Sequence, residues 1–248
     1  MAAFALLAAA SIASLNLCTD EYLLLLAKPQ EIASVSFLSQ DPHESPLWKT
    51  ARGHHANRGS LEQVLARKPA VVLTMGGGGK ATSLIARRLG IRAVDLDPVT
   101  SLGDVAHNFR MTADALGDPR RADPWLRRLS ELQRTRPSRS GTDAIWLGGG
   151  GHTMGAPSVG ADWMRLAGLK QRPLKGNRVS LEALLTRPPS VLVQSRYRSG
   201  QMSRGVQWLD HPIVRGANSR RLEVDGRAWT CMGPLVIPEV ERLRTLLR

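Results

Sequence analysis

The sequence is poor in aromatic residues and in cysteine. Its 248 residues include two tyrosines, three phenylalanines and two cysteines. The formal net charge is +13, but the basic residues are scattered and are not interleaved with aromatic side chains. Such a pattern does not indicate a nucleic-acid partner, because single-stranded nucleic acid is held by basic grooves that also carry stacking aromatics. We expect a solvated basic surface instead.

The two cysteines, Cys18 and Cys231, are far apart in the sequence. They form no CxxC pair and have no zinc-ligand spacing. In an oxidising compartment they can form one disulfide, and the alternative is two free thiols. We do not expect a lipid anchor at Cys18, because Leu17 is larger than the residue that normally precedes a lipidated cysteine.

No uninterrupted apolar run reaches the roughly 18–20 residues that a membrane span needs. The longest apolar region, Met1–Leu17, is interrupted by polar residues. It resembles the apolar part of a secretory signal without its basic start, and Ala8-Ala9-Ala10 offers small residues for cleavage. We therefore predict that residues 1–11 are the remnant of a signal sequence. The alternative is a buried first helix or strand.

Signatures of catalysis are also missing. The sequence shows no nucleophile elbow and no paired-carboxylate pattern. The glycine run Gly76–Lys80 fails as a phosphate loop, because Ala81 follows the lysine where Ser or Thr is needed. His54-His55 indicates a surface loop, since adjacent side chains diverge. We predict no enzyme, no catalytic residue, no cofactor and no metal-ligating residue. Asp97 lies about where a ribose-binding acid would lie, which leaves a nucleotide-cofactor enzyme as an alternative.

An internal repeat is the most informative feature that is present. Residues 57–73 read NRGSLEQVLARKPAVVL, and residues 177–193 read NRVSLEALLTRPPSVLV. The offset is 120 residues, and the two segments are identical at nine of the seventeen aligned positions. Two similar segments at this separation predict a chain with two similar lobes.

Each copy of the repeat predicts a helix that leads into a buried parallel strand. A serine, Ser60 or Ser180, is placed to cap the helix. A proline ends the helix, and a short β-branched run follows. The apolar residues that we expect on the buried stripe are Leu61, Val64 and Leu65 in the first copy and Leu181, Leu184 and Leu185 in the second.

The rest of the chain continues the alternation of strands and helices, which predicts parallel α/β sheets. Further strands are expected at 12–15, 32–36, 93–96, 144–147 and 221–224, and further helices at 19–26, 83–89, 160–167 and 238–247. Residues 101–136 read as helical throughout, with a turn signal, Gly-Asp-Pro, at 117–119. We therefore predict an N-terminal α/β lobe at 12–100, a helical connector with its linker at 101–141, and a C-terminal α/β lobe at 142–248.

This pattern resembles the periplasmic binding proteins of ABC importers that carry cobalamin, haem and ferric siderophores. The landmarks are ASLNLCTDEYLLLLA (13–27), the two SLExxL units, DLDP (95–98) and DGRAWTCMGP (225–234). The resemblance implies two Rossmann-like lobes joined by one long helix, a metal chelate held in the cleft between them, and no catalysis. It also implies a periplasmic location and an ABC permease dimer as partner, so that contact with the membrane is made only through the permease.

Ligands of open parallel α/β sheets lie beyond the carboxyl ends of the strands. Glycines there let the backbone approach a ligand, and aromatic and cationic side chains suit a large chelate with acidic groups. The ligand-binding residues that we expect are Asn16, Cys18, Thr19, Phe37, Gly76, Gly77, Tyr197, Arg198, Trp229 and Cys231.

The resemblance further implies a docking role for Glu62 and Glu182, the glutamates of the two SLExxL units, because the family places one such acid on each lobe against permease arginines. A local role is the alternative, since an acid in the first turn of a helix favours the helix dipole. Two other functions stay open beside transport. One is the nucleotide-cofactor enzyme, and the other is a sensor or scaffold on the same fold that transports nothing.

Overall fold

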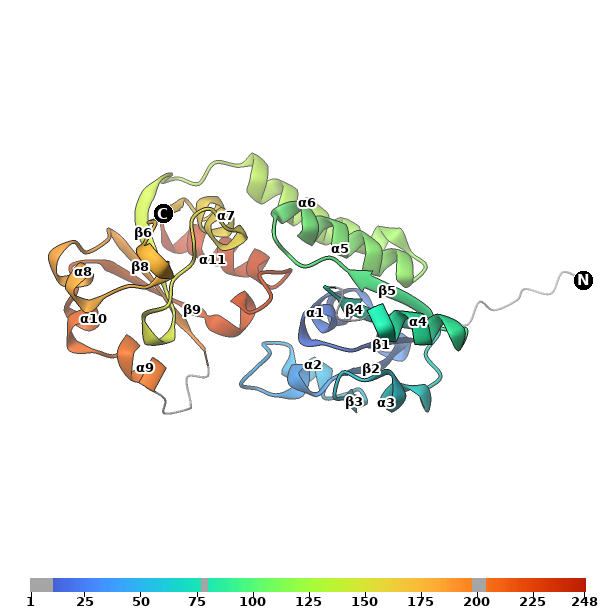
Figure 1. Ribbon diagram of the computed structural model, residues 1–248. Coiled ribbons are helices and arrows are strands. Elements are labelled where there is room, and N and C mark those ends of the chain that lie inside the picture. Colours follow the sequence, from blue (N-terminus) through green and yellow to red (C-terminus); the bar gives the residue numbers. More distant parts are fainter. Residues whose placement is uncertain (1–10, 77–79, 198–203) are drawn as a thin grey trace, which may run out of the picture. The chain divides into compact units, whose positions relative to one another are not determined.

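The computed structural model describes residues 11–76, 80–197 and 204–248. They divide into two compact units. Unit 1 consists of the chain up to Pro98 together with Ala106–Pro124, and unit 2 consists of Val99–Val105 together with Trp125–Arg248. Each unit is built around one parallel sheet with helices against it (Figure 1).

The sheet of unit 1 has five parallel strands in the order β3-β2-β1-β4-β5. Their bounds are β1 (Ile12–Ser14), β2 (Ile32–Ser36), β3 (Ala56–Asn57), β4 (Val71–Met75) and β5 (Arg92–Leu96). The central strand β1 is fully buried, and Ile12 is in register with Ile32 on one side and Val71 on the other. Burial on both faces explains why this strand is almost entirely apolar or small.

Helices and 3-10 turns connect these strands. The α-helices are α1 (Leu17–Leu26), α2 (Trp48–Ala51), α3 (Leu61–Leu65) and α4 (Lys80–Arg88), and the 3-10 turns are η1 (Pro29–Glu31) and η2 (Phe37–Gln40). One core cluster joins Leu61 and Val64 of α3 to Ala13, Leu15, Val72 and Ala86. The helix of the first repeat copy is therefore fixed to the central strands by its apolar face.

The sheet of unit 2 has four parallel strands in the order β7-β6-β8-β9. They are β6 (Thr142–Leu147), β7 (Leu169–Gln171), β8 (Val191–Arg196) and β9 (Arg220–Asp225). The helices are α7 (Val159–Leu166), α8 (Leu181–Thr186), α9 (Arg204–Leu209), α10 (Pro212–Gly216) and α11 (Val236–Leu246), with 3-10 turns η4 (Gly149–Gly151), η5 (Lys175–Asn177) and η6 (Gly226–Trp229).

The connecting segment holds two helices rather than the single long helix that the resemblance implied. They are α5 (Leu102–Ala115) and α6 (Asp123–Arg134), and the turn η3 (Pro119–Ala122) lies between them. Gly117 adopts φ 76°, and the Asp118 side chain accepts a hydrogen bond from the Arg120 N–H, so the chain turns where the sequence showed the turn signal. The boundaries 12–100, 101–141 and 142–248 stay predictions, because α5 is shared between the two units.

The prediction from the repeat is confirmed at the level of the fold. The first copy forms α3 followed by β4 in one sheet, and the second forms α8 followed by β8 in the other. One part of the expectation was wrong. Leu65 and Leu185, which we expected on the buried stripe, are 36% and 68% exposed. These helices are so short that one buried turn anchors them.

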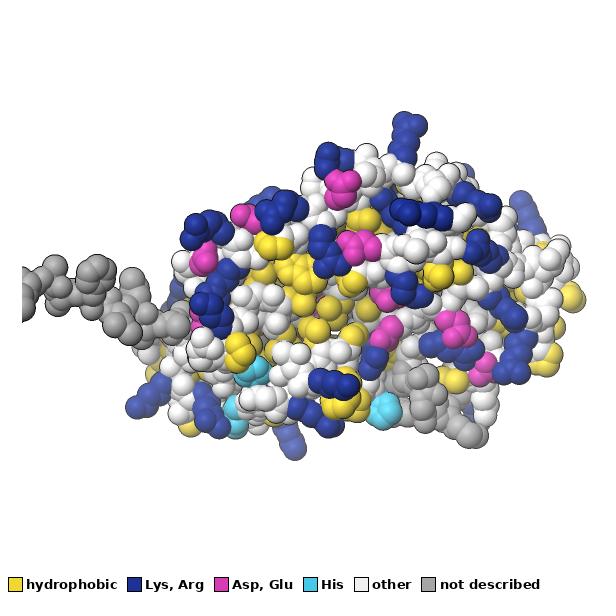
Figure 2. All heavy atoms as spheres, turned by 180° about the vertical axis from the view of Figure 1, so that it is seen from behind, with side chains coloured by type: hydrophobic (Ala, Val, Ile, Leu, Met, Phe, Trp, Pro, Cys, Tyr) yellow, Lys and Arg dark blue, Asp and Glu magenta, His cyan; other side chains and the backbone are white. Residues whose placement is uncertain are grey.

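Within the described residues, no helix combines the length and apolar character that crossing a membrane requires. The predicted signal remnant lies outside the described residues except for Ser11. On the face seen in Figure 2, Lys and Arg side chains are spread over the surface with Asp and Glu among them. This distribution agrees with the solvated basic surface that the scattered arginines predicted.

A buried ion pair fastens the turn η3, in the middle of the connector, to the turn η1, which precedes β2 within unit 1. Arg121 donates to both carboxylate oxygens of Glu31, at 2.5 and 2.8 Å, and the two side chains are only 17% and 6% exposed. The hydrogen bonds from Arg121 lower the pKa of Glu31 below its ordinary value. Because the charged carboxylate is favoured in the folded state, the pair stabilises the unit above the ordinary pKa and loses that effect as the pH falls.

Glu31→Gln is expected to lower the free energy of unfolding by about 1–3 kcal/mol at pH 7, since it removes a charge-assisted bidentate pair. The difference from wild type should shrink as the pH falls below the ordinary glutamate pKa of 4.5. Urea unfolding of both proteins between pH 7 and the acidic range below 4.5 measures this difference in free energy. The control is Glu131→Gln, which removes an exposed pair with Arg134 and should change stability by less than about 1 kcal/mol. Equal effects of the two substitutions would contradict the argument.

Candidate functional site

The carboxyl end of β1 leads directly into α1 through a tightly bonded turn. Asn16 is the N-cap of α1, and its side-chain oxygen accepts from the Thr19 N–H at 3.0 Å. The Thr19 hydroxyl donates to the Asn16 carbonyl at 3.0 Å and lies 2.6 Å from the Ser14 hydroxyl. Thr19 has no exposed surface. Its side chain closes this turn, and its contact with a ligand stays a prediction.

Asp20, the next residue of α1, holds the carboxyl end of β2. Its carboxylate accepts from the Ser36 N–H at 3.0 and 3.2 Å and from the Ser36 hydroxyl at 2.6 Å. Burial raises the pKa of Asp20 to about 7, although the serine hydrogen bonds oppose this shift. Glu21 is also buried, and burial together with the neighbouring Asp20 charge raises its pKa well above the ordinary value. The start of α1 therefore carries two acids that favour the protonated form.

Asn57, the last residue of β3, ties three strand ends together. Its side-chain nitrogen has two N–H donors, which are shared among the Ser14 carbonyl, the Ser34 hydroxyl and the Val35 carbonyl at 2.7–2.9 Å. Its side-chain oxygen accepts from the Gly59 N–H at 2.8 Å. Asn57 is 2% exposed, and the bonds from its nitrogen are buried. The ends of β1, β2 and β3 are thereby fixed to the turn that starts α3.

A pocket of about 760 Å³ opens at this edge of unit 1. Its lining residues are Phe37, His55, Ala56, Asn57, Arg58 and Gln63. The Phe37 side chain is 49% exposed, which makes it a large apolar surface facing solvent. The Gln63 side-chain oxygen accepts from the Arg58 N–H at 2.6 Å and so fixes the backbone that carries the Arg58 side chain. The pocket combines an aromatic ring with cationic and amide groups.

The His55 imidazole has a defined proton position in this arrangement. Its Nδ1 lies 3.1 Å from the Arg67 Nη2. A guanidinium only donates, so Nδ1 accepts, and the neutral ring carries its proton on Nε2. His55 thus offers an N–H donor on its other side. With Arg58 in the same pocket, this favours a ligand that bears acidic groups.

Gly76 directly follows β4 at the same edge of the sheet. It adopts φ 77°, a conformation that favours glycine, and its N–H donates to the Leu96 carbonyl at 3.1 Å. The next predicted residue, Gly77, lies outside the described residues. The sequence-predicted residues of unit 1 thus follow neighbouring strands β1, β2 and β4, as parallel strands require.

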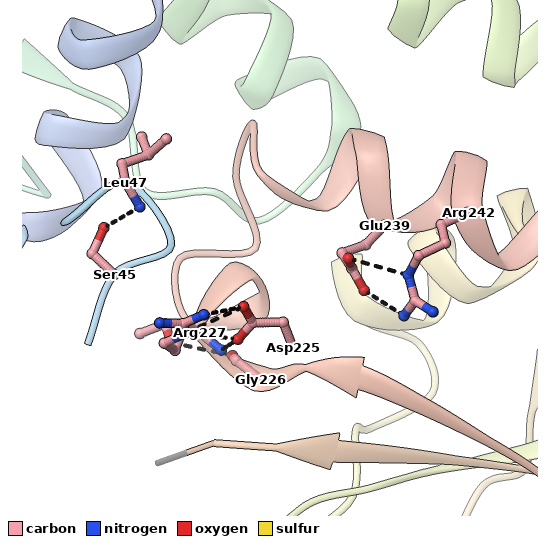
Figure 3. A network of polar contacts seen from close by, with 8 residues as sticks. Ser45, Leu47, Asp225, Gly226, Arg227, Glu239 and Arg242 are labelled. Carbon is pink, nitrogen blue, oxygen red and sulfur yellow. Dashed lines mark hydrogen bonds and ion pairs between the residues drawn. The ribbon is translucent and has the colours of Figure 1, made fainter. Parts of the chain in front are cut away.

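In unit 2 the carboxyl ends of β8 and β9 carry the remaining predicted residues. Tyr197 directly follows β8 and is half-buried, whereas Arg198 lies outside the described residues. Gly226 approaches Tyr197 closely, since a side-chain carbon there would lie 2.9 Å from the Tyr197 nitrogen. Figure 3 shows Asp225 and Arg227 beside this glycine, joined by a bidentate pair at 2.6 and 2.9 Å. This pair fixes the turn η6.

Trp229, the last residue of η6, is 2% exposed and lies 6.3 Å from the Trp146 ring, centre to centre. Its indole N–H has no hydrogen-bond partner among the described residues. Most of the ring is therefore packed inside unit 2 rather than presented as an open face. Its contact with a ligand stays a prediction, as does contact by Asn16, Phe37, Gly76 and Tyr197.

Neither cysteine is a free thiol in the structure. Cys18 lies in the first turn of α1, and Cys231 is the second residue after η6. Both are disulfide-bonded. The alternative of two free thiols is therefore wrong for this structure. Oxidised cysteines are typical of extracytoplasmic compartments.

Sequence reasoning did not select His55 and Arg58 as ligand-binding residues. They flank β3, a strand of two residues, and so short a strand shows no alternation that would reveal it. Without β3 the segment 52–59 reads as a loop. The exposure expected for the two glutamates is confirmed, because Glu62 and Glu182 are exposed in the first turns of α3 and α8. Their role in docking stays a prediction.

No protein-family model matches the chain, and no curated protein matches it in sequence. Solved structures do. A periplasmic heme-binding protein from Pseudomonas aeruginosa superposes with a TM-score of 0.68 at 19% identity, over 96% of this chain and 92% of that one. The periplasmic heme-binding protein HutB of Vibrio cholerae superposes with a TM-score of 0.67 at 19% identity, over 95% of this chain and 98% of that one. The vitamin B12-binding protein BtuF of Vibrio cholerae superposes with a TM-score of 0.62 at 20% identity, over 96% of each chain.

The chain has the fold of these periplasmic binding proteins. The match extends over nearly the full length of both chains, so it includes both units. The predicted fold class is thereby confirmed: parallel α/β lobes with a helical connector.

The raised pKa of Asp20 predicts a distinct pH dependence of stability. The folded protein keeps this proton up to about pH 7, whereas the unfolded chain loses it near 3.8. Between these values the Asp20 contribution to the free energy of unfolding should fall by about 1.4 kcal/mol per pH unit, and above about pH 8 it should be constant. The measurement is urea unfolding of wild type and Asp20→Asn from pH 5 to 8. The exposed Asp123→Asn serves as control. A difference that does not vary with pH would contradict an ionisation near 7.

Proposed function

We propose that this protein is the periplasmic substrate-binding component of an ABC importer, and that it binds a metal chelate of the cobalamin, haem or ferric-siderophore class. The observation that carries the proposal is the pocket of unit 1, in which an exposed Phe37 ring lies beside Arg58 and His55 at the carboxyl edge of the sheet. Ligands of open α/β sheets bind at this edge. The fold is that of proteins described as binding heme and vitamin B12.

The chemistry of the pocket suits such a ligand. A chelate of this class presents a broad apolar face and, in haem, carboxylates at its rim. The Phe37 ring can pack against the face, and the Arg58 guanidinium can pair with the rim. In unit 2 the matching edge carries Tyr197 and the turn η6. We propose that this edge contacts the same ligand, which is then delivered to a membrane permease dimer.

Binding without catalysis is part of the proposal. The solved structures reported above are of binding proteins rather than enzymes. Within the described residues no group of three or more potential metal-ligating side chains gathers. We therefore propose that any metal arrives inside the chelate, and that neither nucleic acid nor a resident cofactor is involved.

Phe37→Ala is expected to weaken chelate binding about 5- to 30-fold, because it removes an exposed ring whose packing and burial contribute roughly 1–2 kcal/mol. Titration of the purified protein with hemin, cyanocobalamin and ferrichrome, followed by visible absorption, identifies the ligand and measures the change. Ile85→Ala is the control, since Ile85 is 45% exposed on α4 and does not line the pocket. If wild type binds one of the three and Phe37→Ala binds it equally well, Phe37 is not in the site.

The double change Glu62→Ala with Glu182→Ala is expected to leave chelate affinity nearly intact and to abolish stimulation of the transporter ATPase in proteoliposomes. Both acids are exposed and lie in first turns of equivalent helices, so they can meet cations on two permease subunits. Glu131→Ala with Glu223→Ala is a matched control, because it removes two exposed acids elsewhere. Normal ATPase stimulation by the Glu62/Glu182 double variant would refute docking by these residues.

A further inference from the structure

The two repeat helices expose a leucine at the same position of the repeat. Leu65 and Leu185 are separated by the repeat offset of 120 residues, and they are 36% and 68% exposed. The preceding apolar positions point inward. Val64 belongs to the core cluster of unit 1, and Leu184 belongs to that of unit 2. Each helix therefore exposes one leucine to solvent, although the apolar residue just before that leucine is buried.

A single exposed leucine on a soluble protein needs no explanation. These two differ from scattered surface leucines in two respects. They occupy equivalent positions in two separate sheets, so one local accident does not account for both. Each also lies three residues after an exposed glutamate, Glu62 or Glu182, and residues at this spacing are neighbours on one helix surface.

We propose that Glu62 with Leu65, and Glu182 with Leu185, form two matching docking faces, each of which inserts its leucine into an apolar pocket beside a cationic group on one subunit of the permease dimer. This inference rests on the proposed function and adds the apolar half of the contact. Two equivalent faces fit a partner that presents two equivalent surfaces, which a twofold dimer does.

The chemistry favours a protein over a lipid surface as the occupant. An anionic membrane would attract basic residues and repel the two glutamates. A protein pocket with a cation at its rim instead matches both side chains of each face, since rim charges set orientation and a buried apolar side chain supplies affinity. The carboxylate of Glu62 is fully exposed, and hydrogen bonds from its own backbone N–H and from Ser60 lower its pKa. It is thus charged and oriented at neutral pH.

The experiment measures the Kd of the protein, without added ligand, for its cognate permease–ATPase complex held in nanodiscs. Leu65→Ala and Leu185→Ala should each weaken binding about 10-fold, and the double variant about 100-fold, because the two faces are independent. Leu84→Ala, which truncates a 54% exposed leucine on α4, should leave the Kd unchanged. Hemin titration and thermal unfolding of each variant check that ligand binding and folding are kept.

The outcomes separate this inference from the function on which it rests. A Kd that is unchanged in the double leucine variant, while Glu62→Ala with Glu182→Ala weakens binding, would overturn the apolar contact and leave docking by the acids in place. A Kd that responds to neither pair would overturn both. If only one of the two single leucine variants bound the permease more weakly, the two docking faces would not be equivalent. Weakened docking with unchanged hemin titration and unfolding curves is the result that supports the inference.

Discussion

The carboxyl edge of unit 1 depends on the buried amide of Asn57. Its two N–H donors are shared among oxygens of Ser14, Ser34 and Val35, and its side-chain oxygen accepts from the Gly59 N–H. The loss of this amide would leave several buried polar groups without a partner, which is costlier than the loss of exposed hydrogen bonds. Because β3 is only two residues long, it has little ladder bonding of its own to hold it in the sheet. The pocket residues His55 and Arg58 flank β3, whose last residue is Asn57, so the amide that holds the strand ends together also helps to fix the pocket.

The two copies of the repeat have the same local structure but differ in their polar contacts. Asn57 has a counterpart in Asn177, but Asn177 is exposed and adopts φ 51° at the end of η5. The two copies share the helix, the serine before it and the strand that follows, whereas the polar bonding before the helix differs. The predicted cap forms only in the second copy, where the Ser180 hydroxyl oxygen accepts from the Ala183 N–H; Ser60 makes no such bond. Function carried by the shared helices can therefore be symmetric, while the carboxyl edges of the two sheets are free to differ between the units.

The sequence was sufficient for the parts of the fold whose signal is local and repeated. The alternation of apolar runs and helical stripes predicted both sheets, and the repeat predicted that α3–β4 and α8–β8 lie in different sheets. Prediction from the sequence failed for features that depend on tertiary contacts. Strands β3 and β7 are too short to show a period. Thr19 and Trp229 were placed correctly after their strands, but the sequence does not tell which side of a turn a side chain takes, and both are buried. Leu65 and Leu185 share the helical stripe with buried neighbours, yet one turn of contact is all that such short helices make with the core.

The segment from His55 to Leu65 places the pocket and the docking face of unit 1 within one continuous stretch of chain. Arg58 lines the pocket, and Glu62 begins the docking face one turn later. The two are joined by more than the covalent chain, because the Gln63 side chain of α3 accepts from the Arg58 N–H at 2.6 Å. The apolar face of the same helix α3 is fixed to β1 and β4 through Leu61 and Val64. Arg58 of the pocket and the proposed docking residue Glu62 are thus linked by one hydrogen bond and one turn of chain, on a helix that the core holds in place.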